Sequence, residues 1–500
     1  MKKFKKLFGF FCAFALILGM NVIPASAEEP TYSITINNIA EGHTYEAYQI
    51  FTGDLYEGKL SNIVWGSGVS DEGKEKLGNA ASKADTLKTE ADAEAFAKEI
   101  APYLTTAAGS ANSVTDGKYV ISGLAAGYYL IKDQDGSLTG DNDSYTEYIV
   151  KVVGNVEQKP KSDVPTVEKK VKDINDSTDD AMTDWQDSAD HDIDDSVPFQ
   201  LKATLADNVS SYTTYKVVFH DTLSKGLTYN NGAKVFIDGT ETNGFTVTST
   251  VNADGTTTLT VSCDDVKALG AGNNSVITVE YTATLNTNAV LGSAGNPNEV
   301  YLEYSNNPNK SEAGNNETGN TPKDVVIVFT YKTVVNKVTK NPDYDPEVEG
   351  SEDYIPLTGA EFTLEKYNNE TDKWEAITAV KNDEGTTFTF SGLDDGKYRL
   401  TETTTPAGYN TIDPIEFTIT AEHEVESDNP ALTSLSGNAE TGEITFTSNT
   451  TEGSLSTDVV NKAGATLPET GGMGTTLFYV AGAGLVLVAV VLLITRKRMN

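Results

Sequence analysis

Residues 277–282 read Ile-Thr-Val-Glu-Tyr-Thr, so that Ile277, Val279 and Tyr281 alternate with polar residues. Successive side chains of a β-strand point to opposite faces, and the alternation predicts a strand with one buried face. Nearby segments repeat the pattern: Phe245-Thr-Val-Thr248, Thr258-Leu-Thr-Val261 and Val300-Tyr-Leu-Glu-Tyr304. Turn dipeptides separate them, at Asn231-Gly232, Asp238-Gly239 and Asp254-Gly255. Residues 161–330 are therefore predicted to form an antiparallel β-sandwich.

Two further units flank this one. Residues 331–465 contain the same kind of short strand, at Glu361-Phe-Thr-Leu-Glu365, Thr387-Phe-Thr-Phe390, Lys397-Tyr-Arg-Leu400 and Ile415-Glu-Phe-Thr-Ile419. Residues 28–160 begin and end with strand-like segments, but residues 71–104 carry apolar side chains at helical spacing. The sequence predicts an all-β chain of tandem sandwich domains, with helical insertions in the N-terminal domain.

Both ends of the chain carry targeting signals. Lys2, Lys3, Lys5 and Lys6 precede a largely apolar segment and a small-residue site, Ala25-Ser26-Ala27, which together predict a secretory signal peptide over residues 1–27. Residues 466–500 contain Leu467-Pro468-Glu469-Thr470-Gly471, an apolar run at 477–494 and Arg496-Lys497-Arg498. At about 1.5 Å per helical residue this run is long enough to span a hydrocarbon core of about 30 Å, so we expect a transmembrane segment.

Composition excludes several kinds of protein. The chain has 37 basic and 73 acidic residues, a formal charge of −36, which argues against nucleic-acid binding. Cys12 would leave with the signal peptide, so Cys263 would be the only thiol and no internal disulfide could form. The four histidines have no metal-ligand spacing, and we expect neither a cofactor nor a zinc site. Some other device must strengthen the exported domains.

The acidic stretch 173–195 has two interpretations. Asp173, Asn175, Ser177 and Asp179 alternate like the first ligands of a calcium loop, but the sixth position is Thr178 and the twelfth is Asp184. A solvated acidic loop is the preferred interpretation, and calcium binding is left open.

Residues 398–409 read Tyr-Arg-Leu-Thr-Glu-Thr-Thr-Thr-Pro-Ala-Gly-Tyr. This stretch closely resembles the E-box of Gram-positive pilins and of CnaB-type domains. The resemblance implies that Lys337 and Asn461 condense into an isopeptide bond, assisted by Glu402. The physics agrees, because burial lowers the pKa of a lysine and frees a nucleophilic amine, while a buried carboxyl stays protonated and polarises the amide.

The middle unit contains a weaker version of this triad. Strand alternation favours Lys169 over Lys170 as the inward amine. Resemblance to CnaA-like middle domains of pilins implies Asn298 as its partner and Asp221 as the buried acid. The first unit has no lysine on its opening strand, and no bond is expected there.

The C-terminal pentapeptide, apolar run and basic tail resemble the sorting signal of Gram-positive surface proteins. In that family a sortase cleaves between the residues that correspond to Thr470 and Gly471. Lys161 follows Pro160 where backbone pilins place the acceptor lysine of their pilin motif, and Lys159 is a lesser candidate. A lysine at this interdomain position is expected to be extended and exposed.

The whole chain resembles the major, or backbone, subunit of sortase-assembled Gram-positive pili. The resemblance implies immunoglobulin-like domains of CnaA and CnaB type in a secreted structural protein, which is no turnover enzyme. Copies of the chain would form a covalent pilus on peptidoglycan, built by pilus and housekeeping sortases, shared with minor pilins and supporting adhesion to host surface ligands. The alternatives are a monomeric wall-anchored adhesin and a surface hydrolase, although the sequence contains no GxSxG, HExxH or Cys/His pair.

Overall fold

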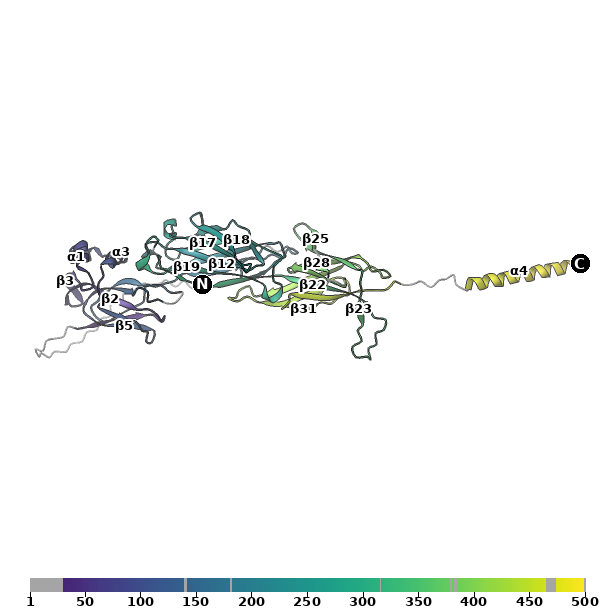
Figure 1. Cartoon of the computed structure of the whole chain (residues 1–500), viewed down its shortest axis with the longest axis horizontal. Coiled ribbons are helices and arrows are strands. Elements are labelled where there is room, and N and C mark those ends of the chain that lie inside the picture. The colour runs from purple at the N-terminus through teal and green to yellow at the C-terminus, as the bar shows by residue number, and fades with distance from the viewer. Residues whose placement is uncertain are drawn as a thin grey trace. The chain divides into compact units, whose positions relative to one another are not determined.

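The computed structural model describes residues 30–138, 142–179, 182–314, 316–377, 380–381, 385–464 and 474–498 (Figure 1). Strands dominate it, which confirms the all-β prediction. The predicted signal peptide and the Leu467–Gly471 sequence lie outside the described residues. The chain divides into two compact units; unit 1 comprises Met1–Val164, Ala206–Tyr215 and Tyr304–Asn320, and unit 2 comprises the rest. The three-domain boundaries remain a prediction.

Unit 1 is built on two sheets and a helical insertion. One sheet has the order β3-β2-β6-β7 with β4 beside β2, and the other has the order β5-β1-β8. The bounds are β1 Tyr32–Asn37, β2 Tyr45–Tyr56, β3 Lys59–Trp65, β4 Gly109–Ala111, β5 Lys118–Leu124, β6 Gly127–Asp133, β7 Glu147–Val152, β8 Val156–Gln158 and β20 Thr318–Asn320. Isoleucine and tyrosine side chains from both sheets form a common core, among them Ile34, Tyr45, Tyr119 and Ile131.

The helical insertion lies between β3 and β4, as predicted. It comprises α1 Asp71–Leu77, α2 Ala80–Thr86 and α3 Glu90–Ile100. Thr89 and Asp92 form a capping box that fixes the start of α3. Phe96 of α3 stacks on Phe51 of β2 at 5.6 Å between ring centroids, so α3 is held against the sheet.

The first part of unit 2 is a sandwich of two sheets, antiparallel except where β10 pairs in parallel with β21. One has the order β10-β21-β19-β12-β17-β16, and the other has the order β15-β14-β18-β11-β9 with β13 beside β18. The bounds are β9 Thr166–Val171, β10 Ser188–Asp190, β11 Ser196–Thr204, β12 Val217–Leu223, β13 Leu227–Tyr229, β14 Lys234–Ile237, β15 Thr240–Thr242, β16 Thr246–Val251, β17 Thr257–Cys263, β18 Val276–Leu285, β19 Asn296–Ser305 and β21 Asp324–Phe329. Along β18 alternate residues are buried, as the sequence predicted.

The second part of unit 2 is another pair of sheets. Their orders are β26-β27-β22-β32-β31, with β23 beside β22, and β25-β24-β28-β29-β30. The bounds are β22 Tyr331–Lys340, β23 Tyr354–Pro356, β24 Glu361–Asn368, β25 Lys373–Ile377, β26 Val380–Lys381, β27 Thr387–Leu393, β28 Gly396–Thr404, β29 Ile415–His423, β30 Leu432–Ala439, β31 Thr447–Asn449 and β32 Ser454–Asn461. The first long strand, β22, pairs in parallel with the last, β32, and the register places Thr339 opposite Asn461.

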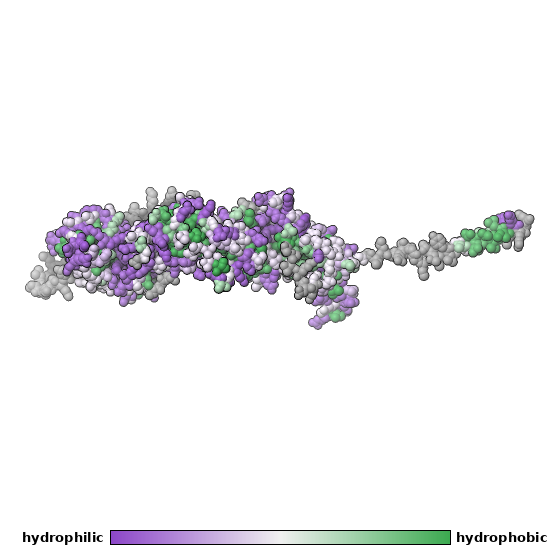
Figure 2. All heavy atoms as spheres, turned by 45° about the horizontal axis from the view of Figure 1, so that its top comes forward, coloured by the Kyte–Doolittle hydropathy of each residue, from purple (hydrophilic) through white to green (hydrophobic). Residues whose placement is uncertain are grey.

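The predicted membrane span falls within helix α4, Gly474–Arg498. Its apolar residues form the green stretch near the C-terminus in Figure 2, and Leu485 and Ile494 are among the exposed ones. Across the residues that the structure describes, however, no helix is both long and apolar enough to cross a membrane. The transmembrane expectation is therefore not supported.

A cluster of charged side chains in unit 1 surrounds the buried His43. His43 Nδ1 lies 2.8 Å from Asp133 Oδ1, and His43 Nε2 lies 3.0 Å from Asp143 Oδ2. Tyr45 stacks on the imidazole at 5.0 Å. Burial alone would lower the pKa of His43, but the two carboxylates outweigh it and raise the pKa to about 9. The imidazole is therefore a fixed positive charge between two acids.

We predict that unit 1 loses stability as the pH rises from about 7 to 9. Its folded state holds a proton on His43 that the unfolded chain, with a pKa near 6.5, has already released, so the free energy of unfolding should fall by up to about 3 kcal/mol. Denaturant titrations followed by peptide-resolved hydrogen exchange measure this. His43→Gln serves as the control and should show no such slope between these pH values; an equal slope in both proteins contradicts the prediction.

Candidate functional site

The second part of unit 2 is called the C-terminal domain below. The three residues predicted to react there meet in its core. Lys337 lies on β22, Asn461 ends β32 and Glu402 lies on β28 of the facing sheet. The side chains of Lys337 and Glu402 have no exposed surface, and Asn461 is fully buried. The parallel pairing of β22 with β32 brings Lys337 and Asn461 together although 124 residues separate them in the chain.

The contacts within this cluster connect all three groups. Lys337 Nζ donates a short hydrogen bond to Asn461 Oδ1 and lies 3.1 Å from Glu402 Oε1. Asn461 Nδ2 donates to both carboxylate oxygens of Glu402, at 3.0 and 3.3 Å. The arrangement places an amine against a carboxamide, with a carboxyl group that touches both reacting side chains.

The surroundings of Lys337 favour its neutral form. Phe362 lies beneath the amine, with the ring centroid 5.3 Å from Nζ. Burial lowers the pKa of Lys337 from its ordinary value, and the nearby Glu402 only partly opposes this. A neutral amine is the nucleophilic form, so the cluster has the chemistry of an amide-forming site.

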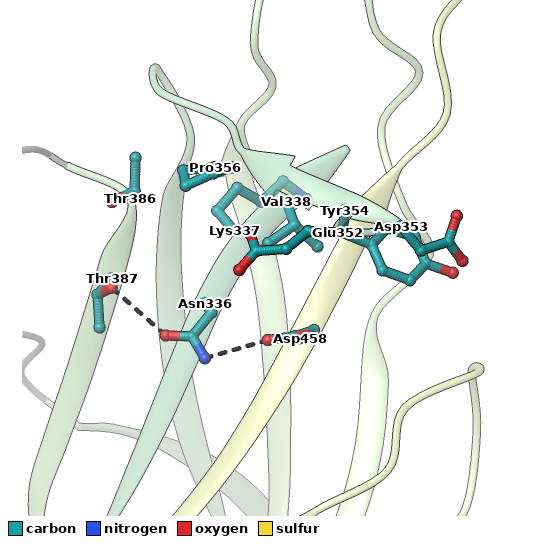
Figure 3. Close-up of a pocket in the computed structure, with 10 residues that line it drawn as sticks. All are labelled: Asn336, Lys337, Val338, Glu352, Asp353, Tyr354, Pro356, Thr386, Thr387 and Asp458. Atoms are coloured by element: carbon teal, nitrogen blue, oxygen red, sulfur yellow. Dashed lines mark hydrogen bonds between the residues drawn. The ribbon is translucent and has the colours of Figure 1, made fainter. Parts of the chain in front are cut away.

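On the opposite face of β22, Asn336 has a structural role. Figure 3 shows Asn336 between Thr387 and Asp458, and hydrogen bonds of 3.4 and 3.1 Å connect it to them. These contacts tie β22 to both neighbouring strands at the edge of a cavity of about 470 Å³, which Glu352 and Asp353 also line. Alternation thus gives Asn336 to the surface and Lys337 to the core.

The first part of unit 2, called the middle domain below, also brings its three predicted residues together. Lys169 on β9, Asp221 on β12 and Asn298 on β19 are all fully buried. Lys169 Nζ donates to Asp221 Oδ1 at 2.5 Å. The adjacent Lys170 instead forms an ion pair with Asp187 nearer the surface. The inward amine is therefore Lys169, as strand alternation favoured.

Sequence reasoning missed a fourth member of this cluster. Tyr281 Oη accepts from Lys169 Nζ at 3.1 Å and from Asn298 Nδ2 at 2.8 Å, and it donates to Asp221 Oδ2 at 2.5 Å. The sequence showed Tyr281 only as an inward apolar position of β18, which any large core residue could occupy. Nothing in the local pattern indicated that its hydroxyl joins the triad.

Burial shifts the titrating groups of this cluster. It lowers the pKa of Lys169 and raises the pKa of Asp221, in both cases as the largest effect. Burial thus disfavours the charged form of each group. A neutral amine is the form that can attack an amide.

The structure corrects the expectation of a free amine at Lys161. Its Nζ forms an ion pair with Glu90 and lies 3.3 Å from Glu94 Oε1, both on α3 of the same unit. Burial would lower the pKa of Lys161, but the two glutamates outweigh it and raise the pKa. Lys159, the lesser candidate, is exposed.

The acidic stretch is not the solvated loop that was preferred. Asp187 and Asp190 are buried, and Asp192 contacts Lys366 of β24 at 2.6 Å. Lys366 also pairs with Asp394, so an ammonium group already occupies the cluster of Asp176, Asp192, Asp195 and Asp394 that could otherwise hold a cation. Those carboxylates outweigh the effect of burial and raise the pKa of Lys366.

The contacts of the residues that resembled calcium-loop ligands do not support the calcium-loop interpretation. Asn175 Oδ1 accepts from the backbone of Ser177, whose hydroxyl donates to the Tyr367 carbonyl. Asp179 accepts from Asn369. These side chains bond to different parts of the surrounding structure instead of converging on one point.

Three family models match separate parts of the chain. A Gram-positive pilin backbone subunit 2, Cna-B-like domain matches residues 193–308, a prealbumin-like fold domain named SpaA matches residues 349–431, and an LPXTG cell wall anchor motif matches residues 459–500. The middle match is described as Cna-B-like, where the sequence resemblance suggested a CnaA-like domain.

Known proteins resemble the chain along nearly its full length. The trypsin-resistant surface T6 protein of Streptococcus pyogenes is 25% identical over 96% of this chain and 97% of the relative. The solved T6 backbone pilin of Streptococcus pyogenes superposes with a TM-score of 0.55 at 19% identity, covering 88% of this chain and all of the other. The major pilin SpaD of Corynebacterium diphtheriae gives 0.47 at 17% identity, covering 89% and 99%.

We predict that Lys169→Ala and Lys170→Ala differ strongly in their effect on stability. Removing Lys169 leaves Asp221 buried without its partner and should cost about 3–5 kcal/mol. Removing Lys170 breaks a pair near the surface and should cost less than about 1 kcal/mol. Urea denaturation of the two variants provides the comparison. Equal midpoints would contradict the assignment of Lys169 as the inward lysine.

Proposed function

We propose that this chain, a backbone pilin of Gram-positive pili with an LPXTG cell wall anchor, is polymerised by a sortase into a covalent pilus. The sortase cleaves between Thr470 and Gly471 and transfers the Thr470 carbonyl to Lys161 of the next subunit. The joint is directional and does not close on itself, so growth is open-ended. Minor pilins, peptidoglycan and a housekeeping sortase are the further partners, and the finished filament supports adhesion.

We also propose that an internal isopeptide bond strengthens the subunit, and the observation that carries this is the buried contact of Lys337, Asn461 and Glu402. In the proposed reaction Lys337 Nζ attacks Asn461 Cγ, and the bond from Cγ to Nδ2 breaks. One proton from the amine passes to Nδ2, which leaves as ammonia, and Glu402 transfers it because it touches both nitrogen atoms. Contact fixed by the fold replaces an external catalyst.

A second bond of the same kind is proposed between Lys169 and Asn298. Each bond would close a loop of more than about 120 residues, which restricts the unfolded chain by about 4–5 kcal/mol on the chain-entropy estimate used for disulfides. Each bond also connects the opening strand of a domain to a late one, β9 to β19 and β22 to β32. Tension could then pass through the covalent link and bypass the strands between.

One observation favours the alternative of a monomeric wall-anchored adhesin. The amine of Lys161 is paired with Glu90 and Glu94 and is not free to attack an acyl-enzyme. Polymerisation therefore requires this ion pair to open and the amine to lose a proton when the sortase docks. A monomeric adhesin would have no such requirement.

We predict that residues 28–470, produced alone, weigh two ammonia molecules less than their formula, about 34 Da. Lys337→Ala and Lys169→Ala should each restore about 17 Da, since each removes one nucleophile. Glu402→Ala should leave the C-terminal bond unformed while the middle bond still forms. Intact-mass spectrometry reads all four proteins, and an unshifted mass for the parent protein would refute both bonds.

We predict that Lys161→Ala abolishes the high-mass ladder on denaturing gels of cell-wall extracts, because the acceptor amine is gone. Lys159→Ala is the matched control, two residues away and exposed, and should leave the ladder intact. Loss of the ladder in Lys159→Ala alone would move the acceptor to that residue. Single subunits in the unmodified strain would favour the monomeric adhesin.

A further inference from the structure

The hydroxyl of Tyr281 is the meeting point of the middle-domain cluster. Its Oη lies 3.1 Å from Lys169 Nζ, 2.5 Å from Asp221 Oδ2 and 2.8 Å from Asn298 Nδ2. These are the nucleophile, the acid and the leaving nitrogen of the proposed condensation. Tyr281 is buried, with only 5% of its surface exposed, so bulk water does not compete for these hydrogen bonds.

The two clusters differ in how the acid reaches the amide. In the C-terminal domain Glu402 touches both Lys337 and Asn461 directly. In the middle domain Asp221 touches Lys169, but the hydrogen-bonded path from Asp221 to Asn298 runs through Tyr281. Asn298 Oδ1 has no hydrogen-bond partner among the described residues. Tyr281 thus occupies the position from which a proton can reach the leaving group.

The ring of Tyr281 is fixed by its neighbours. It stacks on Phe199 with 5.5 Å between centroids and meets Tyr229 edge to face at 5.6 Å. A phenylalanine would satisfy both contacts, so packing alone does not explain the hydroxyl. Burial, and next the charge of Asp221, raise the pKa of Tyr281 well above its ordinary value, so the hydroxyl carries its proton before the reaction.

We propose that Tyr281 is a catalytic residue of the Lys169–Asn298 condensation and delivers the proton to the leaving nitrogen; this rests on the function proposed above. Lys169 Nζ, as the neutral amine, bonds to Asn298 Cγ and gives one proton to the Asp221 carboxylate. The bond from Cγ to Nδ2 breaks as Tyr281 gives its hydroxyl proton to Nδ2, which departs as ammonia. Asp221 then returns a proton to Tyr281, so both residues end as they began.

The test is the variant Tyr281→Phe in residues 28–470, which keeps the ring and removes only the hydroxyl. The bond should form at least about 100-fold more slowly, the usual contribution of a positioned acid or base. Freshly purified protein should therefore show the loss of one ammonia instead of two. Intact mass followed over days gives the rate, and peptide mapping identifies the unlinked Lys169 and Asn298.

Tyr229→Phe is the matched control. Tyr229 contacts the same ring, but its hydroxyl accepts from the backbone of Ala233 and does not touch the triad. This variant should lose two ammonia molecules as fast as the parent. Complete linkage in freshly purified Tyr281→Phe would overturn the role of Tyr281 while leaving the bond itself intact.

A second measurement covers the case in which Tyr281→Phe fails to fold. Replacing Tyr281 alone with 3-fluorotyrosine keeps shape and hydrogen bonds but makes the hydroxyl more acidic, so the rate and its pH dependence should change in a cell-free synthesis time course. An unchanged rate and pH profile would refute proton transfer by Tyr281. A parent protein without the Lys169–Asn298 link, but with the Lys337–Asn461 link, would refute the middle-domain reaction as a whole.

Discussion

The structure depends on the burial of lysine side chains inside β-sandwich cores. Moving an ammonium group out of water destabilises the fold by several kcal/mol unless polar partners compensate, so each buried lysine needs such partners around its amine. Lys337 has an amide and one carboxyl group around it, and Lys169 has one carboxyl group and a tyrosine hydroxyl. The strand order follows from the same requirement, since β22 and β32 must be neighbours for Lys337 to meet Asn461.

The number of carboxyl groups in contact with a buried lysine accounts for the direction in which its pKa shifts. One carboxyl group does not offset burial, and the pKa values of Lys169 and Lys337 are lowered. Around Lys366 the carboxylates of Asp394 and Asp192 more than offset burial, and its pKa is raised. Lys366 therefore stays charged and holds its neighbours as an ion pair, although it lies as close to Asp394 as Lys169 does to Asp221.

Sequence predicted the parts of this arrangement that depend on local pattern. Alternation identified the strands and selected Lys169 over Lys170, and the E-box located Glu402 relative to its lysine and asparagine. Tyr281 was missed because an inward tyrosine has the same sequence signature as any core aromatic residue. The pairing of Lys161 with Glu90 and Glu94 was missed because it joins a loop to a helix 67 or more residues away, which no local pattern encodes.

The same electrostatic argument applies to the order of events in assembly. Under the proposed function, Lys169 and Lys337 must react within their own chain and without an enzyme, and both lie where burial favours the neutral amine. Lys161 must react with another subunit and only on a sortase. Its two glutamates keep it protonated, which makes it a poor nucleophile until a docking partner displaces them. Under the proposed function, the ion pair that contradicted the expectation of a free amine thus gives a physical reason for internal bonds to form before subunits join.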